Sequence, residues 1–230
     1  MNRLATAPVI LALVLPAFAA DPPKPTAAEE KLLAKLKDLK GEATLDPELD
    51  PAARVSVMFE KAEDKTVFAF YKEDAIGAVE IRNIKGLDDQ GFAGLKRMKN
   101  LQKLVLAGGD LKYLEAKHLS ECPKLTTLYV GGVKMSDAAI IGLKGLTKLK
   151  TLDLLDAPIS DKSIDTIVQF ADLENLNLSG TKITDAGVKK LLGMKNLKRL
   201  ELNNSKVTRA GYDALISTLE KEKRELIVRW

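Results

Sequence analysis

The chain has 230 residues, of which 46% are hydrophobic and 30% charged, and its formal net charge is +4. This composition is typical of a soluble folded protein and excludes wholesale disorder. Basic and acidic residues are nearly balanced and spread along the chain, so no concentrated positive surface indicates a nucleic-acid partner. The single cysteine, Cys122, excludes an internal disulfide and any metal site built from several cysteines.

Residues 1–20 have the order of a secretory signal peptide. Arg3 precedes an apolar run over residues 4–15, and Ala17-Phe18-Ala19 provides a cleavage site of small residues. An uncleaved membrane anchor is the alternative, but a run of about twelve residues is shorter than the roughly 20 of a spanning helix. We therefore expect a secreted or periplasmic protein, with no stable membrane insertion after cleavage.

The next segment predicts a helix that covers the first repeat. Thr26-Ala27-Ala28-Glu29 has the pattern of a capping box, and we expect the helix to end at Gly41. Its apolar stripe consists of Leu32, Leu33, Leu36 and Leu39. Pro47 and Pro51 then indicate a loop among acidic residues. The predicted organisation is a signal peptide (1–20), a linker with an N-terminal capping helix (21–51) and a repeat domain (52–230).

One template, L-x-x-L-x-L, recurs with a constant 24-residue period from Leu101 onward. Its five clear copies are Leu101/Leu104/Leu106, Leu125/Leu128/Val130, Leu149/Leu152/Leu154, Leu173/Leu176/Leu178 and Leu197/Leu200/Leu202. Two weaker copies precede them, Ala52/Val55/Val57 and Ile76/Val79/Ile81, which gives about seven units. Each unit is expected to form a strand, a turn and a helix that bury their apolar side only by stacking on the next unit.

These repeats resemble the leucine-rich-repeat family, and most closely bacterial secreted proteins with units such as residues 176–187, LNLSGTKITDAG. The resemblance extends from residue 52 to the end of the chain and implies an α/β solenoid of the ribonuclease-inhibitor-like kind. In such a right-handed β-α superhelix the parallel sheet lies on the concave face and the helices on the convex face. The family's usual Asn or Cys three residues past the triplet is replaced here, so we expect small packing residues instead of a buried amide ladder. These replacements are Gly109, Val133, Ala157, Thr181 and Ser205.

The last unit carries the signals of a C-terminal cap. A longer charged helix is expected over residues 208–224, followed by a closing edge strand over residues 226–230. Trp230 is expected to cover the exposed end of the core.

Three hydroxyl-acid pairs recur at the 24-residue spacing: Ser136-Asp137, Ser160-Asp161 and Thr184-Asp185. One interpretation is that the stacked carboxylates form a divalent-cation site. The other reading is structural, because Ser or Thr caps a helix N-terminus and Asp in the first turn complements the helix dipole. Thr208 keeps the hydroxyl while Arg209 replaces the acid, which favours the cap. We therefore expect no metal and no other cofactor.

The sequence predicts no catalytic machinery. Cys122 falls on a core position and His118 precedes the core residue Leu119, so we interpret them as a buried apolar residue and a solvated helix residue. Serine-elbow, phosphate-loop and zinc-protease motifs are missing from the sequence. Asp153 and Glu201 share an outward column about 9.6 Å apart, which leaves a glycosidase-like carboxylate pair as the enzymatic alternative.

The remaining candidate is the outward face of the strands. Between the second and third triplet residues the sequence reads Ser56, Glu80, Val105, Tyr129, Asp153, Asn177 and Glu201, beside a column of Arg54, Ala78, Lys103, Thr127, Thr151, Asn175 and Arg199. The candidate binding residues are the apolar Val105, Tyr129 and Leu155 and the polar Asp153, Asn177, Lys103 and Arg199.

An aromatic residue with a polar rim is typical of a binding hot spot, and ordinary solvated strand surface is the alternative. We expect a non-catalytic binding module that recognises a protein or a cell-envelope macromolecule through this face. A structural or scaffolding envelope protein is the alternative function.

Overall fold

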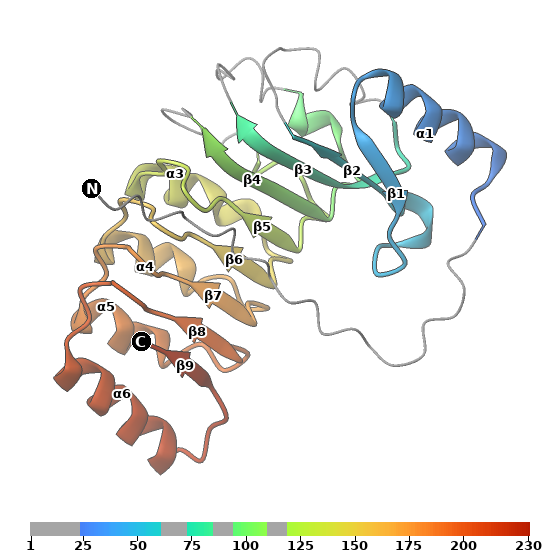
Figure 1. The fold of residues 1–230 in the computed structure, drawn as a ribbon. Coiled ribbons are helices and arrows are strands. Elements are labelled where there is room, and N and C mark those ends of the chain that lie inside the picture. Colours follow the sequence, from blue (N-terminus) through green and yellow to red (C-terminus); the bar gives the residue numbers. More distant parts are fainter. Residues whose placement is uncertain (1–23, 61–72, 85–93, 110–118) are drawn as a thin grey trace, which may run out of the picture.

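The computed structural model describes residues 24–60, 73–84, 94–109 and 119–230. In these residues nine strands form one sheet in sequence order, β1 to β9 (Figure 1). β1 is antiparallel to β2, and each later neighbouring pair is parallel. The predicted signal peptide and His118 lie outside the described residues.

The strands are β1 (Glu42–Leu45), β2 (Val55–Phe59), β3 (Ile76–Ile84), β4 (Lys103–Gly109), β5 (Thr127–Tyr129), β6 (Thr151–Asp153), β7 (Asn175–Asn177), β8 (Arg199–Glu201) and β9 (Ile227–Arg229). The α-helices are α1 (Ala27–Asp38), α3 (Asp137–Gly142), α4 (Asp161–Ile167), α5 (Asp185–Leu191) and α6 (Arg209–Lys221). Short 3-10 helices are η1 (Pro51–Ala53), η3 (Leu95–Arg97) and η5 (Leu143–Gly145).

The core lies between the sheet and the helices α3 to α6, which follow one another along one side of it (Figure 1). Leu128, Leu152 and Leu176 are neighbours across the parallel strands and are buried. The remaining triplet residues from Leu101 onward are buried as well. The 24-residue phase is therefore confirmed as the spacing that stacks one strand directly on the next.

The N-terminal cap confirms the predicted capping box and changes the predicted helix end. Glu29 accepts hydrogen bonds from the backbone N–H and the hydroxyl of Thr26, at 2.7 and 2.9 Å. α1 ends at Asp38, and Lys40, not Gly41, adopts the left-handed conformation, with φ 60°. Gly41 is required for a different reason, because a Cβ there would lie 2.8 Å from the ring of Phe59.

The segment between α1 and β2 contains a strand where we predicted only a loop. β1 pairs with β2 and so extends the sheet by one antiparallel strand. α1 packs on both of these strands, which makes the cap a helix together with a strand.

The assignment of the first repeat, Ala52/Val55/Val57, is wrong by two residues. Val57 pairs with Val79, and Phe59 pairs with Ile81, because the register shifts between Val55 and Ser56. The two outward columns therefore begin with Met58 and Ser56, and Arg54 does not belong to them. The Arg54 guanidinium instead binds the carboxylate of Glu29, at 2.7 and 2.8 Å.

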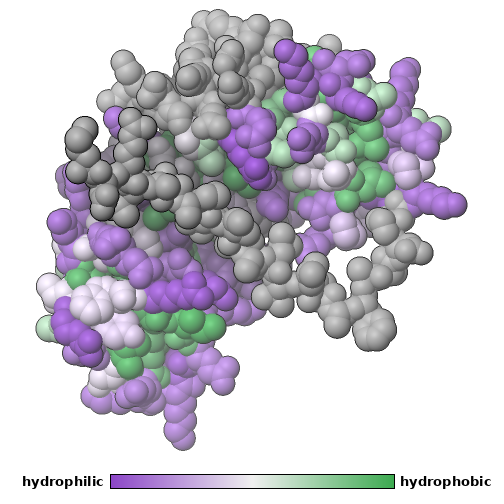
Figure 2. All heavy atoms as spheres, viewed as in Figure 1, coloured by the Kyte–Doolittle hydropathy of each residue, from purple (hydrophilic) through white to green (hydrophobic). Residues whose placement is uncertain are grey.

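The C-terminal end confirms the predicted helix and closing strand. β9 continues the parallel sheet beside β8. The indole of Trp230 stacks on Tyr212 with ring centroids 5.2 Å apart, and its Nε1–H donates to the carbonyl of Val207 at 3.0 Å. Trp230 is still 42% exposed and Ile227 57% exposed, so hydrophobic surface remains beside β9 and α6 (Figure 2).

The recurring hydroxyl residues cap the helices as predicted, but the aspartates next to them have another role. The side chains of Ser136, Ser160, Thr184 and Thr208 each accept a backbone N–H in the first turn of α3, α4, α5 and α6. Each aspartate reaches to the next repeat and accepts from its cap residue. Asp161 accepts from the backbone N–H of Thr184 at 2.9 Å and from its hydroxyl at 2.5 Å.

This inter-repeat aspartate ladder comprises Asp137, Asp161 and Asp185, bound to Ser160, Thr184 and Thr208 respectively. The ladder changes our interpretation of Arg209. The column of aspartates ends at Asp185, because Thr208, which Asp185 binds, caps the last helix of the stack. The ladder also accounts for the glycine of the I-T-D-A-G motif. A Cβ at Gly187 would collide with the carboxylate of Asp161, and one at Gly211 with that of Asp185.

The predicted small packing residues stand where the family has its amide ladder. Val133, Ala157 and Thr181 are buried. The Thr181 hydroxyl donates to the carbonyl of Leu178 at 2.6 Å, so its burial leaves that hydroxyl satisfied.

Candidate functional site

Two rows of side chains project from the parallel strands on the side away from the helices. The Tyr129 row consists of Val105, Tyr129, Asp153, Asn177, Glu201 and Arg229, each on a successive strand from β4 to β9. The basic row consists of Lys103, Thr127, Thr151, Asn175 and Arg199, from β4 to β8. Six of the seven predicted binding residues lie in these rows, and Leu155 lies two residues past the end of β6. We call this surface the strand face.

Tyr129 lies inside the row with its ring half-buried between Val105 and Asp153. Burial raises the pKa of its hydroxyl, and the carboxylate of Asp153 acts in the same direction while Arg199 opposes it. Within the described residues this hydroxyl makes no hydrogen bond to the protein. Tyr129 therefore keeps a neutral donor and acceptor available to a ligand.

Asp153 and Asn177, both predicted as binding residues, form hydrogen bonds within the fold. Asp153 accepts from the backbone N–H of Leu155, and Asn177 from that of Ser179, both at 3.0 Å. The Asn177 amide also donates to the second carboxylate oxygen of Asp153 at 2.9 Å. The two side chains thus close the turns after β6 and β7 and tie these turns together. An Asx residue two positions before a turn N–H is a sequence signal for this role.

Charges on the strand face are partnered unevenly. The carboxylate of Glu80 binds Arg82 at 2.6 Å, that of Glu201 binds Arg229 at 3.4 Å, and that of Glu174 binds Lys198 at 2.7 Å. Lys103 and Arg199 form no ion pair with any described residue. The basic row also contains no carboxylate of its own.

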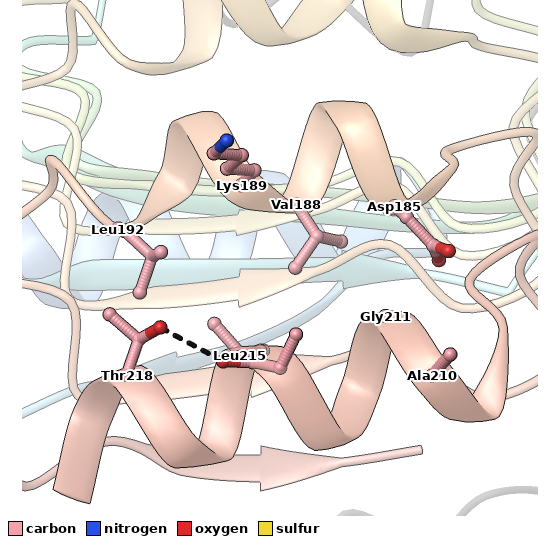
Figure 3. Close-up of a pocket in the computed structure, with 9 residues that line it drawn as sticks. Asp185, Val188, Lys189, Leu192, Ala210, Gly211, Leu215 and Thr218 are labelled. Carbon is pink, nitrogen blue, oxygen red and sulfur yellow. Dashed lines mark hydrogen bonds between the residues drawn. The ribbon is translucent and has the colours of Figure 1, made fainter. Parts of the chain in front are cut away.

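The helix side carries a groove between α5 and α6 with a volume of about 390 Å³. Val188 and Leu192 point from α5 toward Leu215 of α6 (Figure 3). Its titratable residues are Asp185, whose carboxylate already binds Thr208, and Lys189, which points away from α6 in this view. Acid-base or nucleophilic chemistry needs convergent groups, and this lining does not offer them.

Cys122 and clusters of metal-ligating side chains are the remaining candidates for a chemical centre among the described residues. The Cys122 side chain is fully buried, its thiol donates to the carbonyl of Leu95 at 3.4 Å, and burial raises its pKa to about 12. The core position predicted for Cys122 is therefore confirmed. Groups of three or more His, Cys, Asp or Glu side chains that could hold a metal do not occur in the described ranges. The carboxylate pair of the enzymatic alternative, Asp153 and Glu201, is separated in the row by Asn177, whose amide binds Asp153.

The comparison with protein families matches the model described as "Leucine Rich repeat" to residues 172–192, which span β7 and α5. These residues form one of the units that recur with the 24-residue period, in register across the sheet. The chain therefore contains leucine-rich repeats.

A search of curated protein sequences gave no match. Among solved structures, an internalin from Listeria monocytogenes has a similar fold, with a TM-score of 0.55 and 22% sequence identity. The similarity covers 73% of this chain and 44% of the internalin chain, so this chain spans less than half of that protein. This likeness supports the α/β solenoid. No helix among the described residues has the length and hydrophobicity needed to cross a membrane.

Proposed function

We propose that the chain is a non-catalytic binding protein that holds a protein or a cell-envelope macromolecule on its strand face. The observation that carries this proposal is the partly exposed Tyr129, whose hydroxyl has no partner among the described residues. Val105 and Leu155 add apolar surface beside it, and the core does not require these three side chains. Tyrosine gives a large contact area with few rotatable bonds to order, which is why it anchors many interfaces.

The proposed location is secreted or periplasmic, with the leader removed before the protein acts. The support comes from the order of residues 1–20 and from the internalin-like fold. We expect the mature N-terminus at Ala20 or Asp21. N-terminal sequencing of the exported protein tests this, and retention of Met1 would contradict it.

A structural or scaffolding role is the second candidate, and one observation favours it. Several polar groups of the strand face bind one another, as in the pairs Asp153–Asn177 and Glu201–Arg229. A face that satisfies its own polar groups gains less from a partner. The two candidates differ in what happens when Tyr129 is removed, because a scaffold that acts through its shape alone does not depend on one ring.

The test is capture of partners from the native envelope with purified protein and its variants. We expect Tyr129→Ala to weaken capture by at least about 2 kcal/mol, a typical effect for a hot spot, with little change in thermal stability. The matched control is Lys144→Ala with Lys148→Ala, which changes two exposed residues outside both rows. Loss of capture in the lysine variant, with Tyr129→Ala unaffected, would show that the helix side is the working surface.

A further inference from the structure

The strand face has an excess of unpaired positive charge in one row, and this excess specifies a partner. We propose that the basic row binds an extended acidic segment of a partner protein, with one carboxylate at Lys103 and another at Arg199. The proposal rests on the proposed function, since it names the partner of the same face.

Pairing within the face sets the sign of the partner's charge. Carboxylates that border the basic row already have donors: Glu201 has Arg229, Glu174 has Lys198, and Asp153 has Asn177 and the backbone N–H of Leu155. The two cations at the ends of the basic row have no such partner among the described residues. An incoming carboxylate therefore meets unpaired cations, whereas an incoming cation would have to displace an existing partner.

Lys150 and Lys198 strengthen this asymmetry at the border of the basic row. The Glu174 carboxylate lies between them: it binds Lys198 at 2.7 Å, and this bond together with the charges of Lys198 and Lys150 lowers its pKa. One carboxylate thus serves two lysines, which leaves a surplus of positive charge beside the basic row.

Strand spacing sets the length of the partner segment. Lys103 on β4 and Arg199 on β8 are four strand steps apart, which is about 19 Å at about 4.8 Å per step. An extended peptide rises about 3.3 Å per residue, so two carboxylates separated by about six residues match this distance. The residues between the two cations, Thr127, Thr151 and Asn175, carry neutral hydrogen-bonding groups.

The Tyr129 row adds a preference for an apolar side chain near one end of the partner segment. Val105 and Tyr129 lie next to Lys103 and Thr127 on the same two strands, β4 and β5. An apolar residue close to the first carboxylate of the segment would contact both. Farther along this row lie the carboxylates of Asp153 and Glu201, with Asn177 between them and Arg229 paired to Glu201. These carboxylates would repel an acidic segment, which keeps its acids over the basic row.

The experiment uses a fluorescein-labelled seven-residue peptide with glutamate at its first and last positions, leucine at its third, on the same face as the glutamates, and serine or threonine elsewhere. A peptide with glutamine in place of both glutamates is the control. Binding to the full mature protein is followed by fluorescence anisotropy at low salt. We expect Lys103→Glu with Arg199→Glu to weaken binding of the acidic peptide at least about tenfold, since two ion pairs become repulsive. The charge-matched variant Lys144→Glu with Lys148→Glu should leave it unchanged.

Four results would overturn the inference: no binding of the acidic peptide, equal binding of the glutamine peptide, no effect of the Lys103 and Arg199 reversal, or displacement of the captured native partner by heparin but not by the acidic peptide. The last result would identify a sulfated glycan as the occupant.

Parallel capture of the native partner separates this inference from the proposed function. If Tyr129→Ala abolishes capture and the charge reversal does not, the strand face binds a partner of another kind; if neither variant affects capture, both proposals fail.

Discussion

Replacing Asp137 by alanine removes the acceptor of three hydrogen bonds that cross from the α3 repeat to the α4 repeat. The carboxylate accepts from the backbone N–H of Ser160 at 2.8 Å, from its hydroxyl at 2.7 Å and from the hydroxyl of Ser163 at 2.5 Å. Burial acts to raise the pKa of Asp137, but the bonds from Ser160 and Ser163, with Lys162 nearby, bring it below its usual value. The carboxylate is therefore held in its charged form by the neighbouring repeat.

The expected cost follows from what the substitution leaves behind. Ser163 is fully buried, so its hydroxyl would lose its acceptor without gaining water, at about 1–3 kcal/mol. Ser160 also loses charge-assisted bonds, each stronger than a neutral bond. We expect Asp137→Ala to lower the free energy of unfolding by about 3 kcal/mol.

Urea titration followed by circular dichroism measures this change, and the double-mutant cycle with Ser163→Ala isolates the contact. We expect a coupling energy of at least about 1 kcal/mol between Asp137 and Ser163. Asp165→Ala is the matched control: its pair with Lys190 also joins two repeats, at 2.5 Å, but both side chains are exposed. That variant should cost no more than about 1 kcal/mol. Equal costs for Asp137→Ala and Asp165→Ala would refute the ladder as a clamp between repeats.

Three further predictions concern the core, the N-terminal cap and the cysteine. Leu152→Ala should cost about 2–5 kcal/mol in the same titration, because the side chain is fully buried in the middle of the stack; a cost under about 1 kcal/mol would refute the repeat phase. Glu29 has its pKa lowered from 4.5 to about 2, chiefly by its hydrogen bonds from Arg54, so the stability it adds is fully present above pH 4.5 and lost as the pH falls through about 2. Thermal melts should therefore show Glu29→Gln less stable than wild type above pH 4.5, with the difference shrinking toward pH 2, and a constant difference would contradict the assignment. Cys122, buried and with a pKa of about 12, should react with thiol reagents only after denaturant is added, as an absorbance assay at neutral pH would show.

The sequence predicts the fold well where the repeats are regular. From Leu101 onward each apolar position has a counterpart in every following repeat, so strand, core and helix cap follow from local pattern alone. The first repeat lacks leucines, and its register depends on an irregularity between Val55 and Ser56 that only the pairing with β3 reveals. β1 is likewise defined by its partner β2, since four residues with two outward polar side chains carry little signal of their own.

The candidate site was predictable in position but not in the use of its side chains. Strand alternation places Tyr129, Asp153 and Asn177 on one face, as expected. Whether a polar side chain is available to a partner depends on its neighbours in the next repeat, and these are a whole repeat away in sequence. Asp153 is engaged by Asn177 for this reason, as Asp137 is by Ser160.

Site-specific photo-crosslinking tests most directly whether a partner lies on the strand face. A photoreactive phenylalanine at Thr127 lies next to Tyr129 on β5 but in the basic row, and one at Ile141 lies on α3, where the native side chain is 49% exposed. We expect a crosslinked adduct with the native partner from Thr127 and none from Ile141. An adduct from Ile141 without one from Thr127 would contradict this expectation.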